Sequence, residues 1–223
     1  IGLSQIISTL MEISKIEKIE NERKKSEIKA LQRQINPHFL FNALNTITSF
    51  IRINPDKARK LIINLSTYMR YNLEVNDNLI DINKELEQVK AYVEIEKARF
   101  GDKLTVLYDI DENIEAKIPS LTIQPLVENA VQHGIHDCME TGWIRMSIHQ
   151  NEDMLDITIS DNGAGMTEEM IAKVMSGSAS QDNEDRFSTG IAVRNVIDRL
   201  QLYYKQKEFF TIESDGPEPQ FIL

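Results

Sequence analysis

Four polar side chains near the start of the chain recur at helical spacing. Gln34, His38, Asn42 and Asn45 are separated by four, four and three residues, which places them on one face of a helix. A neutral imidazole is a nucleophile near pH 7, and an amide one turn further along can reach the space beside it. His38 is therefore a candidate nucleophile. This segment alone fits a capping or partly buried histidine in a helical bundle better.

The residue before this histidine is a proline. Inside a helix, Pro37 would lack its own N–H and would clash with the carbonyl of Arg33, at a cost of about 3 kcal/mol. The sequence therefore predicts a kink beside His38.

A second group of candidate residues lies in the C-terminal half. Asp161 ends an apolar strand and can accept a hydrogen bond, while Gly163 and Gly165 let the backbone approach a ligand closely. Gly190 lies at the start of an expected helix, where free N–H groups and the helix dipole favour an anion. Each signal also fits an ordinary turn or helix start.

A third candidate lies on the helix expected from Ser120 to His133. Asn129 and His133 are one turn apart there, and the amide oxygen of Asn129 is a hard donor suited to Mg²⁺. A polar stripe on a packed helix explains the pattern equally well.

The elements that must position these residues change character near residue 101. Up to Phe100 the pattern is helical, with helices opening at Asn54-Pro55 and at Asp81. After it come strands at 104–110, 143–150, 155–161 and 209–214, a final edge strand at 221–223, and helices near Thr167 and Gly190. The expected fold is an α domain followed by an α/β sandwich, a mixed sheet with helices on one face.

The first 35 residues contain two apolar seams at coiled-coil spacing. We expect them to form a parallel dimeric stalk, with a monomeric amphipathic helix as the alternative. The seams are Leu3, Ile6, Leu10 and Ile13, and then Ile28, Leu31 and Ile35.

Composition excludes several classes of protein. The chain has 223 residues, 41% hydrophobic and 27% charged, which is a globular mixture. Its net charge of −10 argues against direct nucleic-acid binding, which needs clustered basic residues. The single Cys138 excludes an internal disulfide. No apolar run reaches the roughly 18 residues of a membrane span. Because the sequence begins at Ile1 rather than Met, we expect a fragment whose upstream part, a candidate membrane-embedded segment, is missing.

Taken together and in this order, the motifs resemble the sensor histidine kinases of the LytS and YesM type, whose ATP-binding domain has the Bergerat (GHKL) fold. The resemblance runs from about Ile28 to the end of the chain. Its motifs are residues 34–42, residues 124–130 with His133-Gly134, Tyr92 to Phe100, the Asp161 turn, and Arg194-Asn195-Val196 with Arg199-Leu200. It implies a signalling helix at 1–27, a dimerisation and phosphoacceptor domain at 28–101, and an ATP-binding domain at 102–223.

The resemblance also implies a function. The chain would be the cytoplasmic kinase core of a bacterial inner-membrane protein, dimeric through its N-terminal helices. It would bind ATP with Mg²⁺, phosphorylate His38 and pass the phosphoryl group to an aspartate of a response-regulator receiver domain. Asn129 would hold Mg²⁺ through ATP and Asp161 would read the adenine amino group. Gly163 and Gly165 would shape the pocket, His133 would lie near it without an assigned role, and Gly190, Ile191 and Arg194 would lie toward the phosphates.

One role follows from spacing. The amide of Asn42 could orient a water molecule that dephosphorylates the partner receiver domain.

Departures from the family pattern keep alternatives open. Ser188 and Ala192 stand where glycines are usual, and a methyl group at Ala192 could crowd the triphosphate, which would suit a pseudokinase scaffold. Phe39 stands where many histidine kinases have an acid, so the assisting base is unidentified. Pro125 stands where GHKL ATPases have their general base, which favours transfer over hydrolysis. A metal enzyme built on His133 and His136 lacks further ligands.

Overall fold

The computed structural model describes residues 36–74, 79–136, 141–152, 154–177, 188–204, 210–214 and 219–222. The two coiled-coil seams lie outside these ranges. The chain divides into two units, Ile1–Asn42 and Ala43–Leu223. Within the described ranges, no helix combines the length and apolar character needed to cross a bilayer.

Helix α2 (Pro37–Ile53) begins at the proline that precedes the histidine. The side-chain oxygen of Asn36 accepts hydrogen bonds from the backbone N–H groups of His38, at 3.1 Å, and Phe39, at 3.2 Å. Asn36 is thus the N-cap, and Pro37 occupies the first helical position, where a missing N–H costs nothing. The expected kink is wrong, because the asparagine before Pro37 starts a helix instead of continuing one.

Helix α3 (Pro55–Glu74) follows after one residue. As predicted, Asn54 caps it, accepting a 3.0 Å hydrogen bond from the N–H of Lys57. Ala58, Leu61 and Leu65 are buried along one face of this helix. Tyr68 continues this buried face.

Helix α4 (Ile82–Phe100) packs against α3 and begins at the predicted cap. The carboxylate of Asp81 accepts a 2.8 Å hydrogen bond from the N–H of Asn83. Asp81 also ends β1 (Leu79–Asp81), which pairs antiparallel with β3 (Lys117–Pro119) in a small two-stranded sheet. The sequence did not reveal this sheet, because three residues are too few to show alternation.

The main sheet has five strands in the order β2-β4-β5-β7-β6. The strands are β2 (Leu104–Ile110), β4 (Gly142–Asn151), β5 (Met154–Asp161), β6 (Thr211–Ser214) and β7 (Pro219–Ile222). β2 and β4 are parallel and the other neighbours are antiparallel, so the sheet is mixed, as expected. β7 is not the expected edge strand, because it pairs with both β5 and β6.

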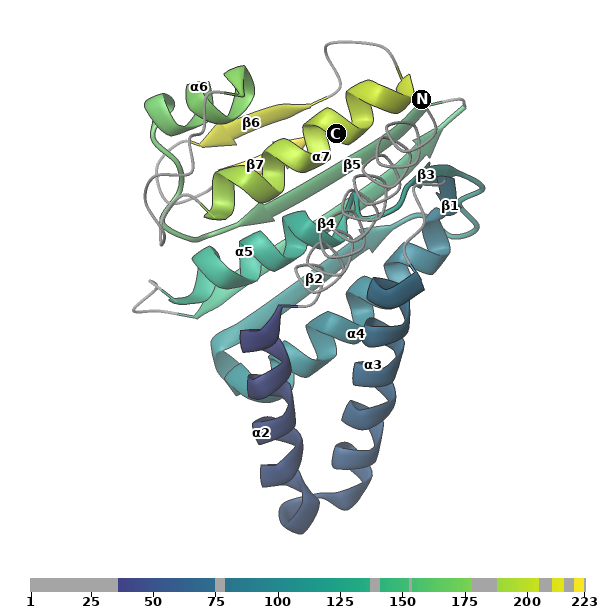
Figure 1. Ribbon diagram of the computed structural model, residues 1–223, viewed down its shortest axis with the longest axis vertical. Helices are drawn as coiled ribbons and strands as arrows, with labels where there is room; N and C mark the ends of the chain where they lie inside the picture. The colour runs from purple at the N-terminus through teal and green to yellow at the C-terminus, as the bar shows by residue number, and fades with distance from the viewer. Residues whose placement is uncertain are drawn as a thin grey trace, which may run out of the picture. The chain divides into compact units, whose positions relative to one another are not determined.

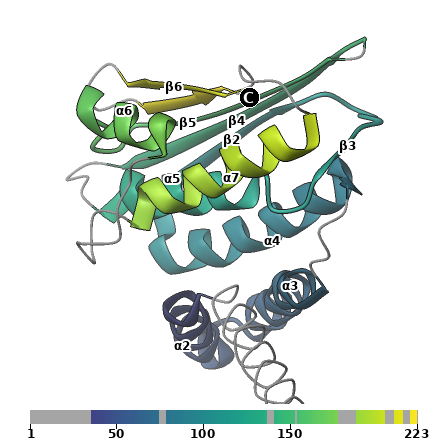
Figure 2. The same ribbon diagram turned by 45° about the horizontal axis from the view of Figure 1, so that its top comes forward.

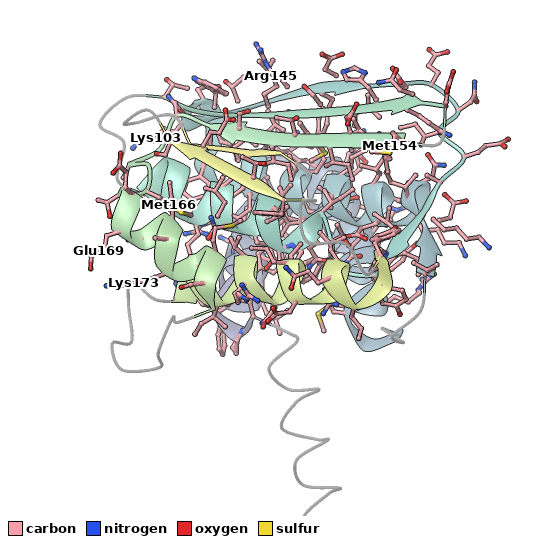
Figure 3. All side chains as sticks on the ribbon, turned by 90° about the horizontal axis from the view of Figure 1, so that it is seen from above. Lys103, Arg145, Met154, Met166, Glu169 and Lys173 are labelled. Atoms are coloured by element: carbon pink, nitrogen blue, oxygen red, sulfur yellow. The ribbon has the colours of Figure 1, made fainter. Side chains whose placement is uncertain are left out.

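Helices cover one face of this sheet. They are α4, α5 (Gln124–His136) and α7 (Ser188–Tyr204), which lie beneath the strands in Figure 2; in Figure 1, α7 runs in front of the sheet. The sheet residues that face them are buried and apolar, among them Val106, Ile144, Met146, Ile157 and Ile159. Arg145 projects from the opposite face (Figure 3). The predicted α/β layer with helices on one side is therefore confirmed.

Helix α6 (Glu168–Ser176) begins where the sequence predicted. Thr167 is its N-cap, with the hydroxyl accepting from the N–H of Met170 at 3.3 Å. Glu169 and Lys173 pair on its exposed side at 2.7 Å, one turn apart (Figure 3).

Candidate functional site

His38 lies in the first turn of α2 with its side chain exposed. The amide nitrogen of Asn42 lies 3.2 Å from Nδ1 of the imidazole and 3.4 Å from Nε2. The predicted reach of Asn42 to the imidazole is confirmed. An exposed imidazole beside an amide is open to a reaction partner, and the amide can orient either the ring or a molecule next to it.

The buried carboxylate of Asp161 ends β5. One oxygen accepts a 2.9 Å hydrogen bond from the N–H of Gly163. Among the described residues no other hydrogen bond to this carboxylate is present. Burial raises its pKa to about 7, against the opposing effect of the Gly163 hydrogen bond. A desolvated carboxylate with acceptor capacity to spare fits a ligand N–H donor such as the adenine amino group.

The turn after Asp161 is held at two points. Asn162 accepts a 2.6 Å hydrogen bond from the N–H of Trp143 and donates to the carbonyl of Thr141 at 3.2 Å. Further on, the N–H of Met166 donates to the hydroxyl of Ser214 at 3.0 Å. Between these points Gly165 has φ = +70°, a conformation that favours glycine.

Asn162 was not singled out from the sequence. Its signal is an asparagine directly after a strand, which commonly bonds to nearby backbone. The partner strand could not be named from that signal.

Helix α5, which carries Asn129, begins later than expected. Ser120 is not its cap, because the helix starts at Gln124 and ends at His136. The buried carboxylate of Glu85 on α4 instead accepts from the N–H groups of Ile123, at 2.6 Å, and Gln124, at 3.2 Å. Burial raises the pKa of Glu85 to about 7, with these backbone hydrogen bonds opposing the rise. The helix start is therefore set by a residue on another helix.

The turn before α5 is fixed from a third helix. Arg199 on α7 donates to the carbonyls of Ser120, at 2.7 Å, and Leu121, at 2.9 Å. Leu121 has φ = +58°, so the chain bends sharply there. Arg199 thus has a structural task beside the site.

Asn129 lies in the second turn of α5 and is 6% exposed. Among the described residues, none hydrogen-bonds its side chain. Magnesium commonly takes one or two protein oxygens together with substrate phosphates, and an unengaged buried amide suits that arrangement. His133 lies in the same helix, and its side chain falls outside the described part.

The first turn of α7 contains Gly190 and Ile191. The helix begins at Ser188, two residues before the expected start. Gly190 is buried and Ile191 is 39% exposed, while Ala192 is half-buried. A seventeen-residue helix offers the free N–H groups and dipole that favour phosphate at its start.

Arg194 on α7 bonds to protein groups. Its guanidinium donates to the carbonyls of Val174, at 3.3 Å, and Met175, at 2.7 Å, and pairs with Asp198. Gly177 ends α6 with φ = +75°, and a Cβ there would lie 3.3 Å from Cζ of Arg194. Arg194 therefore joins the end of α6 to α7, a role that the sequence did not suggest.

Within the described ranges, no group of three or more His, Cys, Asp or Glu side chains could hold a metal ion.

Comparison with known proteins agrees with these features. Residues 26–104 match the histidine kinase family model. Residues 115–213 match the model of histidine kinase-, DNA gyrase B- and HSP90-like ATPases. The chain is 50% identical over its whole length to the sensor histidine kinase YpdA of Escherichia coli K12, of which it covers 38%. It is 39% identical over 96% of its length to the sensor protein LytS of Staphylococcus haemolyticus, of which it covers 36%.

Among solved structures, a bacterial phosphotransferase superposes with a TM-score of 0.50 at 11% identity. The match covers 86% of this chain and 95% of the other, which shows a shared fold.

The chain combines a histidine kinase segment with an ATPase segment of the GHKL type. It belongs to the sensor histidine kinases of the LytS type. It spans less than two-fifths of the length of the curated relatives described here.

Proposed function

We propose that this chain is the kinase core of a two-component sensor. It binds ATP with Mg²⁺, phosphorylates His38 and transfers the phosphoryl group to an aspartate of a response regulator. The observation that carries the proposal is the exposed imidazole of His38, capped in place at a helix start and accompanied by the Asn42 amide. Membership of the sensor histidine kinases supports it.

The nucleotide contacts are assigned by the chemistry of each group. The buried carboxylate of Asp161 accepts the adenine amino group, and Gly163 and Gly165 admit the base close to the backbone. The start of α7 at Gly190 and Ile191 receives the phosphates. Asn129 holds the magnesium ion, which when bound neutralises and orients the phosphates. Arg194 acts on this region through its hydrogen bond to the end of α6, and His133 has no assigned role.

His38 acts as the nucleophile. A lone pair on an imidazole nitrogen forms the N–P bond to the γ-phosphorus while the bond from that phosphorus to the bridging oxygen breaks, and ADP leaves with that electron pair. The remaining ring proton passes to solvent. Phosphoryl transfer needs position and charge neutralisation more than covalent help, which suits a site without an identified base.

Asn42 serves the removal of phosphate from the response regulator. Its amide lies beside the imidazole and orients water for hydrolysis of the aspartyl phosphate on the receiver domain. Replacing Asn42 by Ala is expected to slow that dephosphorylation several-fold. An unchanged rate would refute this role.

The core works as a homodimer. Exposed apolar side chains on the hairpin helices support this, since a second copy would cover them. They are Leu44, Ile51 and Ile53 on α2 and Ile62 and Ile63 on α3. In the whole protein we place the core on the cytoplasmic side of the bacterial inner membrane, with a protein partner and no direct contact with nucleic acid.

Two other functions remain for the experiment to separate. Ala192 near the start of α7 favours a pseudokinase scaffold that binds nucleotide weakly. The GHKL fold also fits an ATPase. Pro125, in the first turn of α5, argues against it, because a proline in the position of the general base cannot activate water.

The test is incubation with γ-labelled ATP and Mg²⁺. The kinase predicts an acid-labile label on the protein that disappears in His38→Gln. A scaffold predicts no label, and an ATPase predicts free phosphate without label.

A further inference from the structure

Tyr68 on α3 hydrogen-bonds to Glu128, the residue next to Asn129 on α5. The hydroxyl donates to Oε1 of Glu128 at 3.1 Å, and Tyr68 is 1% exposed. Gln124, one turn earlier on α5, donates its side-chain amide to the same oxygen. The ring of Tyr68 packs against Tyr92 of α4, with 5.8 Å between centroids. The contacts of Tyr68 join residues far apart in the chain, so no local sequence pattern predicts them.

The Tyr68 hydroxyl remains a hydrogen-bond donor to Glu128. Burial and then the Glu128 charge raise the pKa of Tyr68 well above its usual value, so the hydroxyl keeps its proton. Tyr68 and Gln124 both donate to Oε1 of Glu128. Without Tyr68 the half-buried carboxyl group would lose one of its two described donors.

The contact constrains its neighbour through the helix. Successive residues on an α-helix point about 100° apart, so a fixed Glu128 fixes the rotation of α5 and with it the direction of Asn129. Asn129 has no hydrogen-bond partner among the described residues that could hold it directly. Glu85 holds the start of the same helix, and the next described contact that holds α5, one turn further on, is the one at Glu128.

We propose that Tyr68 and Glu128 are positioning residues that set Asn129 for magnesium binding, an inference that rests on the proposed function. Tyr68 belongs to the helix that follows α2. A displacement of α3 therefore weakens the metal site, and by reciprocity metal-nucleotide binding resists that displacement.

The first test uses Tyr68→Phe, which keeps the ring against Tyr92 and removes only the hydroxyl. Calorimetry would measure binding of ATP with Mg²⁺, and of adenosine with EDTA. The affinity for Mg-ATP is expected to fall roughly three- to tenfold, as for loss of one hydrogen bond, and that for adenosine by less than about twofold. The Mg²⁺ concentration that gives half-maximal autophosphorylation is expected to rise as the Mg-ATP affinity falls. Tyr108→Phe on β2 is the matched control and alters none of these.

The second test changes the partner. Glu128→Gln keeps an oxygen that can accept from Tyr68 and is expected to bind Mg-ATP as wild type does. Glu128→Ala is expected to behave like Tyr68→Phe, and the double variant to be no weaker than Glu128→Ala alone.

Three outcomes overturn the inference. The first is an unchanged Mg-ATP affinity in Tyr68→Phe, and the second is an equal loss of Mg-ATP and adenosine affinity in that variant. The third is a Glu128→Gln variant that binds Mg-ATP normally but does not label His38, because Glu128 would then take part in the chemistry. A wild-type protein that binds no Mg-ATP overturns the proposed function and this inference together. A wild type that binds it alongside an unaffected Tyr68→Phe overturns the inference alone.

Discussion

His38, in the first turn of α2, and Asn129, on α5, are held in position by different kinds of contact. His38 sits one turn from its companion Asn42 and two residues after its cap Asn36, so every described contact that orients it comes from the same helix start. The helix that carries Asn129 is contacted by Tyr68 from α3, and the turn before it is held by Glu85 from α4 and Arg199 from α7. Contacts within one helix start persist when neighbouring helices move, whereas we expect a site whose supports come from several helices to change when any of them moves.

The largest effect is expected at the proposed nucleophile, His38. His38→Gln should abolish the acid-labile label while leaving the melting temperature within a few degrees, because the side chain is exposed. His149→Gln is the matched control, because this histidine lies on β4 and interacts with Asp109 of β2 and with Asp111, which follows β2. Persistent label in His38→Gln would place the phosphoacceptor elsewhere.

Loss of the distant cap should cost the most stability. Glu85→Ala leaves two buried N–H groups before α5 without an acceptor, and we expect about 3 kcal/mol of lost unfolding free energy by urea denaturation. Exposed Glu87→Ala on the same helix should change it by less than about 0.5 kcal/mol. Equal small effects would show that α5 does not need this anchor.

Asp161→Asn should move stability and binding in opposite directions. The raised pKa of Asp161 means that the folded state holds a proton which the unfolded state releases near pH 4, so this group's contribution to stability falls as the pH rises from about 4 to about 7. The amide lacks that penalty, so the nucleotide-free variant should be more stable at pH 8 by roughly 1–3 kcal/mol in urea.

The same variant should bind adenosine at least about tenfold more weakly, because an amide accepts a hydrogen bond from the base less well. Asp156→Asn, exposed on the same strand, is the control for both measurements. A less stable Asp161→Asn at pH 8 would contradict the electrostatic account.

The smallest effect belongs to the local cap. Asn36→Ala should cost about 1 kcal/mol of stability, as for other N-caps, and reduce labelling of His38 only modestly. Exposed Asn45→Ala on the same helix is the control. A loss as large as that of Glu85→Ala would remove the distinction between local and distant support.

Much of the fold could be read from the sequence because its signals are short-range. Asn54 and Asp81 cap the helices that they were expected to cap, and Thr167 caps the helix that was expected near it. The strands at 104–110 and 155–161 follow from alternation of buried side chains. Pro37 was misjudged inside a helix, because the choice between kink and helix start depended on whether Asn36 turned its side chain onto the following N–H groups.

What the sequence alone determined is therefore the faces of helices and strands, most of their caps, and the candidate residues of both sites. The tertiary structure alone decided that α5 starts at Gln124, that β7 lies inside the sheet, and that Tyr68 meets Glu128. The reason is distance along the chain. A cap and its N–H lie within three residues, whereas Glu85 and Ile123 are 38 residues apart and Tyr68 and Glu128 are 60 apart. Such pairs meet only when the helices pack, and no local pattern encodes them.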